Sequence, residues 1–261
     1  MTISGTTALI GHTGFVGGNL ARQHRFDDAF NSRNIEQIAG RNFDLIVCAG
    51  VPAAKWKANA DPEGDERNIA RLMSALERAN AERIVLISTV DVFIVPIAVD
   101  EASSIPTTNA QPYGRNRRHL EQFVAARFDA TIVRLPGLYG RGLKKNAIYD
   151  LLHGNELHKV DSRGVFQFYG VDRLWRDINV ALANELEVVH LPTAPVSVAD
   201  VARTAFGMDF TNETAAAPAK YDIRTRCAEL FGGKAGAPYI EAREQELAGI
   251  TAFVVAERAH D

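Results

Sequence analysis

Cysteine is scarce in this sequence: only Cys48 and Cys227 occur among 261 residues. Two thiols cannot form the disulfide framework that stabilises small secreted domains. Cys48 lies in an apolar run, where a buried and reduced side chain is the simplest interpretation. We therefore expect a protein of a reducing compartment, the cytoplasm.

Long apolar runs and an excess of one charge are also missing. No uninterrupted apolar run of about 18 residues occurs, so we expect no membrane span. The N-terminus enters a strand pattern directly, without the pattern of a signal peptide. The formal net charge of -3 gives no global reason to expect nucleic acid or an anionic membrane as partner. The seven histidines show no metal-ligand spacing, and we expect no metal.

What the sequence does contain is a regular alternation of apolar strands and amphipathic helices up to about residue 135. The expected strands are 7–10, 26–31, 43–49, 83–88 and 130–135, and the expected helices are 15–23, 65–80 and 114–127. This order is typical of βαβ units with right-handed crossovers. It predicts an α/β fold with a doubly wound parallel sheet of the Rossmann kind.

The alternation of strands and helices becomes irregular beyond residue 140. Short helices are expected at 147–152 and 174–186, strands at 165–169 and 188–191, and a helix that Ser197 caps and that runs to Phe206. Residues 211–220 are polar and alanine-rich, as in a surface connection. We assign residues 1–140 to a cofactor-binding domain, and residues 141–261 to a mixed region that completes the sheet and forms a small C-terminal substrate lobe.

A glycine turn follows the first strand and opens the first helix. Backbone N–H groups in such a turn, together with the positive end of the helix, can hold a dinucleotide pyrophosphate. The spacing is GxxGxxG, one residue looser than the GxGxxG fingerprint, and a purely structural turn is the alternative. The candidate cofactor contacts are Gly11, His12, Thr13, Gly14, Phe15, Val16 and Gly17.

The end of the second strand bears on the choice of dinucleotide. NAD-binding sheets usually carry a carboxylate about 20 residues past the first glycine, for the ribose 2′-OH. Residues 30–34 contain no carboxylate, whereas Ser32 and Arg33 could grip a 2′-phosphate. NADP is therefore favoured over NAD, and the alternative for Arg33 is an ordinary solvated loop residue.

Small residues end two further strands, where a cofactor can come close. They are candidate cofactor contacts, although each group could simply terminate its strand. Trp56, between Lys55 and Lys57, could line a pocket, but a solvated loop is the favoured interpretation. The contacts expected here are Ala49, Gly50, Val51, Pro136, Gly137 and Leu138.

Tyr113 and Arg117 stand four residues apart in an expected helix, so they share one face. A phenol with a pKa near 10 is a poor base at neutral pH, and a nearby cation lowers that pKa. The pair therefore suits proton transfer beside a nicotinamide.

Four segments in order carry a family resemblance: the glycine turn, residues 88–93, residues 113–117 and residues 133–140. The chain resembles extended short-chain dehydrogenases/reductases, in the NAD(P)-dependent epimerase/dehydratase branch that acts on nucleotide sugars. Residues 88–89 and the compact region around the second strand are also similar to dTDP-4-dehydrorhamnose reductase. The resemblance implies a catalytic Ser/Thr–Tyr–Lys triad, which maps onto Thr89, Tyr113 and Arg117.

Arginine at position 117 departs from the family's lysine. It keeps the charge, but its planar fork differs in shape and it cannot pass on a proton. We therefore expect a hydride-transferring oxidoreductase or epimerase with Tyr113 as acid/base, and keep a non-catalytic NADP-binding sensor as the alternative. A reductase of small carbonyl compounds is a weaker third reading.

The resemblance also bears on substrate and assembly. It implies that a nucleotide sugar is held near the strand ends and at the start of the substrate lobe. It further implies a homodimer through paired helices, for which residues 71–78 and 115–127 are the candidates. The expected substrate contacts are Val90, Asp91, Lys145 and Asn146.

Overall fold

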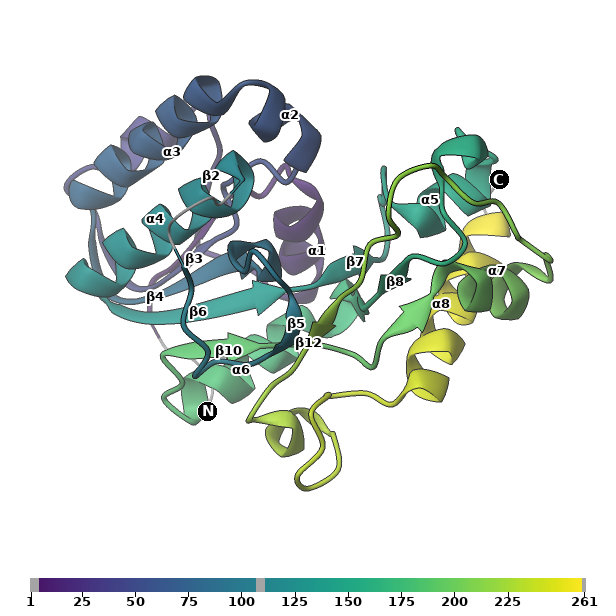
Figure 1. Cartoon of the computed structure of the whole chain (residues 1–261). Helices are drawn as coiled ribbons and strands as arrows, with labels where there is room; N and C mark the ends of the chain where they lie inside the picture. Colours follow the sequence, from purple (N-terminus) through teal and green to yellow (C-terminus); the bar gives the residue numbers. More distant parts are fainter. Residues whose placement is uncertain (1–4, 107–110, 260–261) are drawn as a thin grey trace. The chain divides into compact units, whose positions relative to one another are not determined.

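The computed structural model describes residues 5–106 and 111–259, which form two compact units (Figure 1). The first unit contains the described parts of residues 1–95, 104–134 and 172–189. The second contains residues 96–103, 135–171 and the described part of 190–261. Each unit is therefore assembled from segments that are distant in the sequence.

A six-stranded sheet in the order β10-β6-β4-β3-β1-β2 organises the first unit. β1 pairs in parallel with β2 and β3, and β3 pairs in parallel with β4. The order reverses between β1 and β3, so the sheet has the flavodoxin-like doubly wound order, and the prediction of a doubly wound parallel sheet is confirmed. The strands are β1 Thr7–Ile10, β2 Asp28–Phe30, β3 Asn42–Cys48, β4 Asn80–Thr89, β6 Asp129–Leu135 and β10 Val188–His190.

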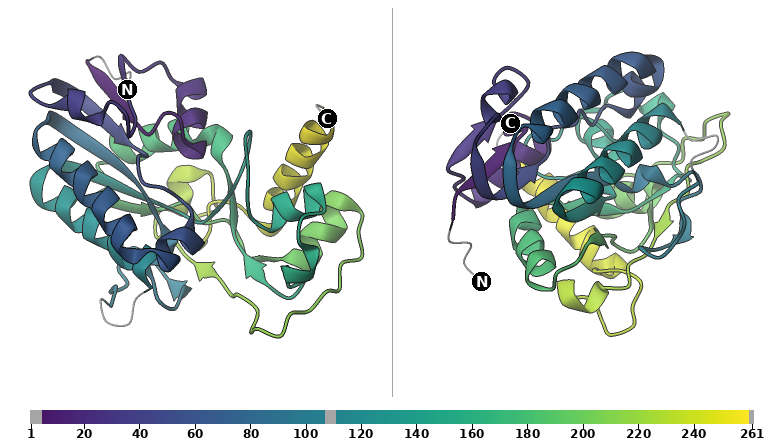
Figure 2. Two further views of the ribbon diagram at one scale, coloured as in Figure 1. Left: turned by 90° about the horizontal axis from the view of Figure 1, so that it is seen from above. Right: turned by 90° about the vertical axis from the view of Figure 1, so that its left-hand side faces the viewer.

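Helices cover both faces of this sheet (Figures 1 and 2). α2, α3 and α4 contact one another on one face, and α1 contacts α6 on the other. Ile84 and Leu86 of β4 pack in one cluster with Leu120 of α4, while the intervening Val85 is equally buried. Burial on both faces explains the continuous apolar strands of the sequence. The helices are α1 Phe15–Gln23, α2 Lys55–Ala60, α3 Pro62–Glu77, α4 Pro112–Arg127 and α6 Leu174–Ala183.

The second unit is built from short strand pairs and three helices. β7 Gly137–Tyr139 pairs with β9 Phe168–Gly170, β8 Val165–Phe166 with β11 Val196–Ser197, and β5 Ile97–Val99 with β12 Asp222–Ile223. Its core joins Ile148, Val201 and Ile250, one from each of α5 Ala147–His153, α7 Val198–Phe206 and α8 Arg243–Arg258. Ser197 caps α7 in a capping box with Asp200, as expected.

Several elements differ from the expectation. The segment around Trp56 forms the short helix α2 rather than a loop, and the expected strand at 165–169 divides into β8 and β9. α8 was not predicted, because its buried residues are Glu246, Ile250 and Val254, a narrow stripe that begins with a charged residue. Short 3-10 helices complete the description: η1 Ile35–Ile38, η2 Val90–Val92, η3 Leu157–Lys159, η4 Val171–Arg173 and η5 Ala228–Phe231. Among the described residues, no helix has both the length and the apolar character that a bilayer span requires.

Candidate active site

The glycine turn after β1 is too tight for side chains at two of its positions. Gly11 has φ +90°, and a Cβ on it would lie 2.3 Å from the Ala49 carbonyl oxygen. A Cβ on Gly17 would lie 2.2 Å from the Gly11 carbonyl oxygen, so α1 starts closer to the turn than any side chain permits. These glycines bring the start of α1 against the ends of β1 and β3.

The same turn fits a dinucleotide pyrophosphate. Gly14 is the N-cap of α1, with no side-chain cap hydrogen bond and no acidic residue in the first turn. Thr13 and Gly14 are exposed, and a Cβ on Gly14 would approach the Gly11 carbonyl oxygen only to 3.3 Å. The N-terminal amides of α1 therefore face no competing carboxylate of their own first turn, as an anion requires.

The carboxyl end of β2 adjoins this turn. The backbone N–H of Gly11 donates to Phe30 O at 2.7 Å, and His12 Nδ1 lies 3.0 Å from the same oxygen. Ser32 and Arg33 are exposed in the turn that follows. The predicted contacts from residues 11–17, 32–33 and 49–51 thus belong to the carboxyl ends of three adjacent strands, β2, β1 and β3.

The two acidic residues of the β2 segment are already bonded to other residues of the first unit. Asp27 accepts hydrogen bonds from the backbone N–H and the hydroxyl of Thr7, and Asp28 forms an ion pair with Arg41. Both stand before the carboxyl end of the strand, which finishes at Phe30. The turn after β2 therefore carries the exposed Ser32 and Arg33 and no acid in residues 31–34.

Thr89 and Tyr113 are brought together by a close helix contact. Thr89 ends β4, and its Oγ1 accepts from the backbone N–H of Asp91 at 3.1 Å. A Cβ on Gly114 would lie 2.1 Å from the Asp91 carbonyl oxygen, so α4 approaches η2 at a distance that only glycine permits. The Tyr113 phenol consequently lies near the Thr89 hydroxyl, which lowers the pKa of Tyr113.

Arg117 lies beneath the phenol ring and is buried, with 4% of its surface exposed. Its guanidinium carbon lies 3.9 Å from the centre of the Tyr113 ring, within cation–π distance. The guanidinium also forms an ion pair with Asp65 and donates to Pro52 O at 2.6 Å and Tyr113 O at 3.2 Å. Arg117 is thus fully engaged inside the first unit.

Asp65 is a residue that the sequence reasoning missed. It accepts from Arg117 and, at 2.9 Å, from Asn116 Nδ2. Asp65 precedes Ile69 by four residues and Leu72 by seven, so it occupies a core position of α3. A carboxylate at an apolar helix position was the signal that could have found this ion pair.

Burial dominates the chemistry of the phenol. The pKa of Tyr113 is raised above its ordinary value, first by burial, and the positive charge of Arg117 opposes this without overcoming it. Asp91 raises the pKa further, whereas the Thr89 hydrogen bond and Lys55 lower it. The expected lowering by Arg117 is therefore present but outweighed, and the phenol stays protonated at neutral pH.

A second buried ion pair fixes the same strand ends. Arg134 of β6 donates from Nε and Nη2 to the two carboxylate oxygens of Glu121, at 3.0 and 2.7 Å. The Ser88 hydroxyl donates to Glu121 Oε1 at 2.6 Å. This network joins β4, α4 and β6 next to Thr89, which restricts the motion of the elements that carry the site.

The remaining predicted residues belong to the second unit. Gly137 and Leu138 lie in β7, directly after Pro136, and Lys145 is exposed. Asn146 caps α5: its Oδ1 accepts from Tyr149 N at 3.1 Å, and its Nδ2 donates to Leu138 O at 2.8 Å. Both ends of this amide serve the structure of the unit.

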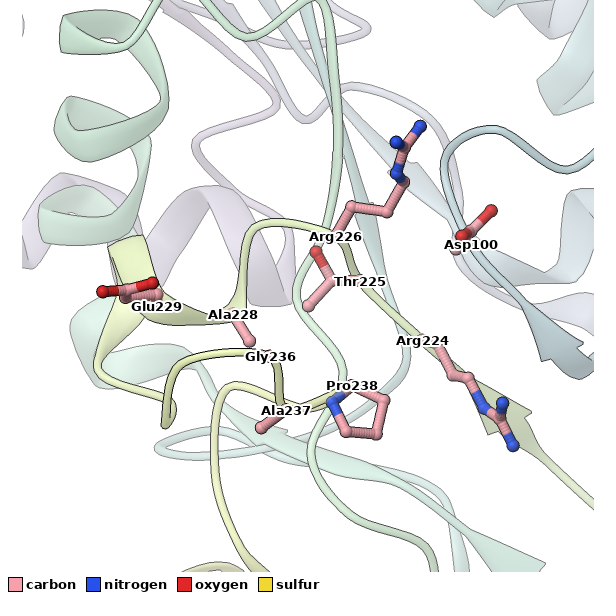
Figure 3. Close-up of a pocket in the computed structure, with 9 residues that line it drawn as sticks. All are labelled: Asp100, Arg224, Thr225, Arg226, Ala228, Glu229, Gly236, Ala237 and Pro238. Atoms are coloured by element: carbon pink, nitrogen blue, oxygen red, sulfur yellow. The ribbon is translucent and has the colours of Figure 1, made fainter.

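The second unit also contains a cavity of about 240 Å³, which sequence reasoning did not indicate (Figure 3). Thr225 and Arg226 are tied there to Glu101 by a side-chain bond of 2.6 Å and a backbone N–H bond of 2.9 Å. The polar residues that line the cavity are Asp100, Arg224, Thr225, Arg226 and Glu229.

Comparison with known sequences settles the family. The sequence model of the NAD-dependent epimerase/dehydratase family matches residues 24–160, more than half of the chain. The chain belongs to this family. Among curated proteins, none matches the chain. The family match begins after the glycine turn, which is supported by its own geometry.

Solved structures similar to this epimerase/dehydratase family member share its fold. dTDP-4-dehydrorhamnose reductase from Bacillus anthracis, in complex with NADP, has 20% identity and a TM-score of 0.73, covering 98% of this chain and 99% of that chain. MoeE5 in complex with UDP-glucose and NAD has 17% identity and a TM-score of 0.68, covering 98% and 100%. UDP-glucose 4-epimerase from Thermotoga maritima, with UDP-glucose, has 14% identity and a TM-score of 0.65, covering 98% and 99%.

Proposed function

We propose that this family member is an NADP-dependent oxidoreductase or epimerase that acts on a nucleotide sugar. One observation carries the proposal: the open glycine turn and the Thr89–Tyr113 pair both lie at the carboxyl ends of strands in one parallel sheet. Ligands of open α/β sheets bind at this edge. Similar structures that hold NAD or NADP and UDP-sugars support the same class of reaction.

The dinucleotide would be held by residues 11–17 through the pyrophosphate, and by Ser32 and Arg33 through a 2′-phosphate. NAD is the alternative cofactor. Residues 49–51 and 136–138 complete the proposed contacts with the cofactor. The nicotinamide, when bound, supplies the hydride that is exchanged with a substrate carbon.

Tyr113 carries the proton in this mechanism. Its raised pKa keeps the free phenol protonated, so it is ready to donate to a carbonyl oxygen as hydride adds to the adjacent carbon. In the reverse direction the phenolate must form, and the positive charge of Arg117 favours it. Thr89, near the phenol, would donate its hydroxyl hydrogen to the same substrate oxygen.

We assign the nucleotide sugar to Val90 and Asp91 in the first unit and to Lys145 and Asn146 in a substrate lobe formed by the second. A small carbonyl compound is the alternative substrate. We further propose a cytoplasmic protein that forms homodimers through α3 and α4. Light scattering of the purified protein tests the dimer, and a monomeric mass at micromolar concentration excludes it.

A non-catalytic NADP-binding sensor is the second candidate function. The observation that favours it is the ion pair between Arg117 and Asp65, which occupies the residue at the family's lysine position. Such a protein would bind the dinucleotide and respond to it without turning over a sugar.

Fluorescence titration with NADPH and NADH, followed by turnover assays on a sugar-nucleotide panel, tests the proposal. Tyr113→Phe should lower turnover by about 10²- to 10⁴-fold, the usual contribution of a positioned acid or base, and leave NADPH affinity unchanged. Tyr149→Phe, in α5, is the matched control and should have no effect. Undiminished turnover in Tyr113→Phe removes the mechanism, and binding without turnover across the panel favours the sensor.

A further inference from the structure

We propose that Lys55, paired with Asp91, supplies the accessible positive charge of the active site, the role that the family resemblance gives to position 117. This inference builds on the proposed function, because it concerns the same phenol. It adds a residue from α2, a helix absent from the sequence prediction.

Arg117 cannot act as an adjustable cation. Its guanidinium is shared among the Asp65 carboxylate and the carbonyl oxygens of Pro52 and Tyr113. The side chains of Arg117 and Asp65 are only 5% and 6% exposed, so the pair is an internal, charge-compensated unit. Arginine also stays protonated in proteins, which leaves it no part in proton exchange.

One face of α2 contacts both elements that carry the catalytic pair. Lys55 Nζ lies 2.8 Å from Asp91 Oδ1, and Asp91 in turn donates its backbone N–H to Thr89. Asn59, one helical turn later, accepts the backbone N–H of Tyr113 at 3.0 Å. Residues four apart share a helix face, so Lys55 and Asn59 together join η2 to the start of α4.

The two cations, Lys55 and Arg117, differ in their exposure to solvent. The Lys55 side chain is 41% exposed and that of Asp91 is 21% exposed, so this pair is accessible to water at the end of β4. A lysine ammonium is a compact charge on a flexible stem, unlike the planar guanidinium. Lys55 therefore has the access to the strand ends that Arg117 lacks.

The charged groups that act on the phenol come from three elements: Arg117 from α4, Asp91 from η2 and Lys55 from α2. Asp65 of α3 faces Arg117. Lys55 lowers and Asp91 raises the pKa of Tyr113. Removing Lys55 should therefore raise this pKa, and removing Asp91 should lower it. A merely structural role of the ion pair would not give opposite signs.

The test is the protonation of Tyr113, read by NMR of carbon-labelled tyrosine in the full-length protein and assigned with Tyr113→Phe. Lys55→Met should move the midpoint upward, and Asp91→Asn should move it downward. Lys55→Arg should not raise the midpoint, because it keeps the positive charge. Lys57→Met, two residues away on the same helix, is the matched control and should leave it unchanged.

The pH profile of NADPH-dependent turnover, measured on the same variants, separates this inference from the proposed function. Shifted NMR midpoints without turnover in any variant would support Lys55 and remove the enzyme. Turnover with an unmoved midpoint in Lys55→Met, or an equal shift in Lys57→Met, overturns the inference and leaves the proposed function standing. Melting curves should be nearly unchanged, since half-exposed ion pairs contribute little stability.

Discussion

The two units treat buried carboxyl groups in opposite ways. In the first unit, Asp65 is paired with Arg117 and Glu121 with Arg134. In the second, Glu246 accepts the backbone N–H of Phe168 at 2.6 Å, and its other oxygen has no partner among the described residues. Burial raises the pKa of Glu246 to about 9, so this side chain keeps its proton at neutral pH.

The difference shows how each unit compensates its buried polar groups. An unpaired buried charge costs far more than a neutral group, so a carboxyl without a cation is protonated instead. The second unit accordingly uses neutral contacts: Gln167 donates to Thr193 O at 2.5 Å and Ile223 O at 2.8 Å, which ties its short strands together. The first unit keeps charges next to the phenol, where they can affect proton transfer.

The strongest test removes this contrast by leaving Asp65 without its cation. Arg117→Met should lower the free energy of unfolding by about 3–5 kcal/mol, because it leaves an uncompensated buried carboxylate. Urea denaturation checks this, with Arg115→Met on the exposed side of α4 as the control. The double variant with Asp65→Asn should recover part of the loss, and equal stability of Arg117→Met and Arg115→Met would show that the ion pair is not buried in solution.

Glu246→Gln tests whether the buried carboxyl of the second unit is protonated. A carboxyl with a folded pKa of about 9 holds its proton where the unfolded chain, near 4.5, has lost it. Its contribution to the free energy of unfolding is therefore complete below pH 4.5 and falls as the pH rises to about 9, by about 1.4 kcal/mol for each pH unit.

The Glu246→Gln variant should lose this dependence and melt relatively higher at pH 8 than at pH 5, compared with wild type. Thermal melting across this range measures the difference between the two proteins. Glu244→Gln, exposed on the same helix, should follow wild type. Parallel curves for Glu246→Gln and wild type would mean that Glu246 is ionised.

Gly114→Ala tests whether the charges of the first unit depend on the close approach of α4. The added methyl would overlap the Asp91 carbonyl, so we expect a loss of about 1–3 kcal/mol and weaker turnover as Tyr113 moves from Thr89. Gly18→Ala is the control: its Cβ would lie 3.5 Å from His12 O, and alanine favours the helix. Calorimetry should show Gly114→Ala melting below wild type and Gly18→Ala at or above it.

Arg33→Ala concerns an exposed cation and has the smallest expected effect. Loss of a charge-assisted contact to a 2′-phosphate should weaken NADPH binding about tenfold and leave NADH binding unchanged. Fluorescence titration measures both, with Arg25→Ala, exposed before β2, as the control. An equal loss for both dinucleotides would assign Arg33 to the fold of the turn instead.

Local patterns allowed much of the first unit, and the start of α7 in the second, to be predicted. The apolar runs of β1 and β3, the helix of residues 15–23 and the Ser197 cap follow from period, propensity and capping alone, and each is confirmed. α2 and α8 could not be predicted, because α2 buries only Ala58 and α8 buries a glutamate among its few core residues. The triad of Thr89, Tyr113 and position 117 was visible in the sequence, but its roles stay predictions.

By itself the sequence determined the parallel sheet, the glycine turn and the face shared by a phenol and a cation, because these depend on spacing along one segment. Only the tertiary structure decided which groups surround that phenol. Asp65 and Pro52 bind Arg117, the cation beneath the ring, from 52 and 65 residues away in the chain, and Lys55 binds Asp91 from 36 residues away. Electrostatic effects depend on distance in space and on burial, and neither is encoded in any local pattern.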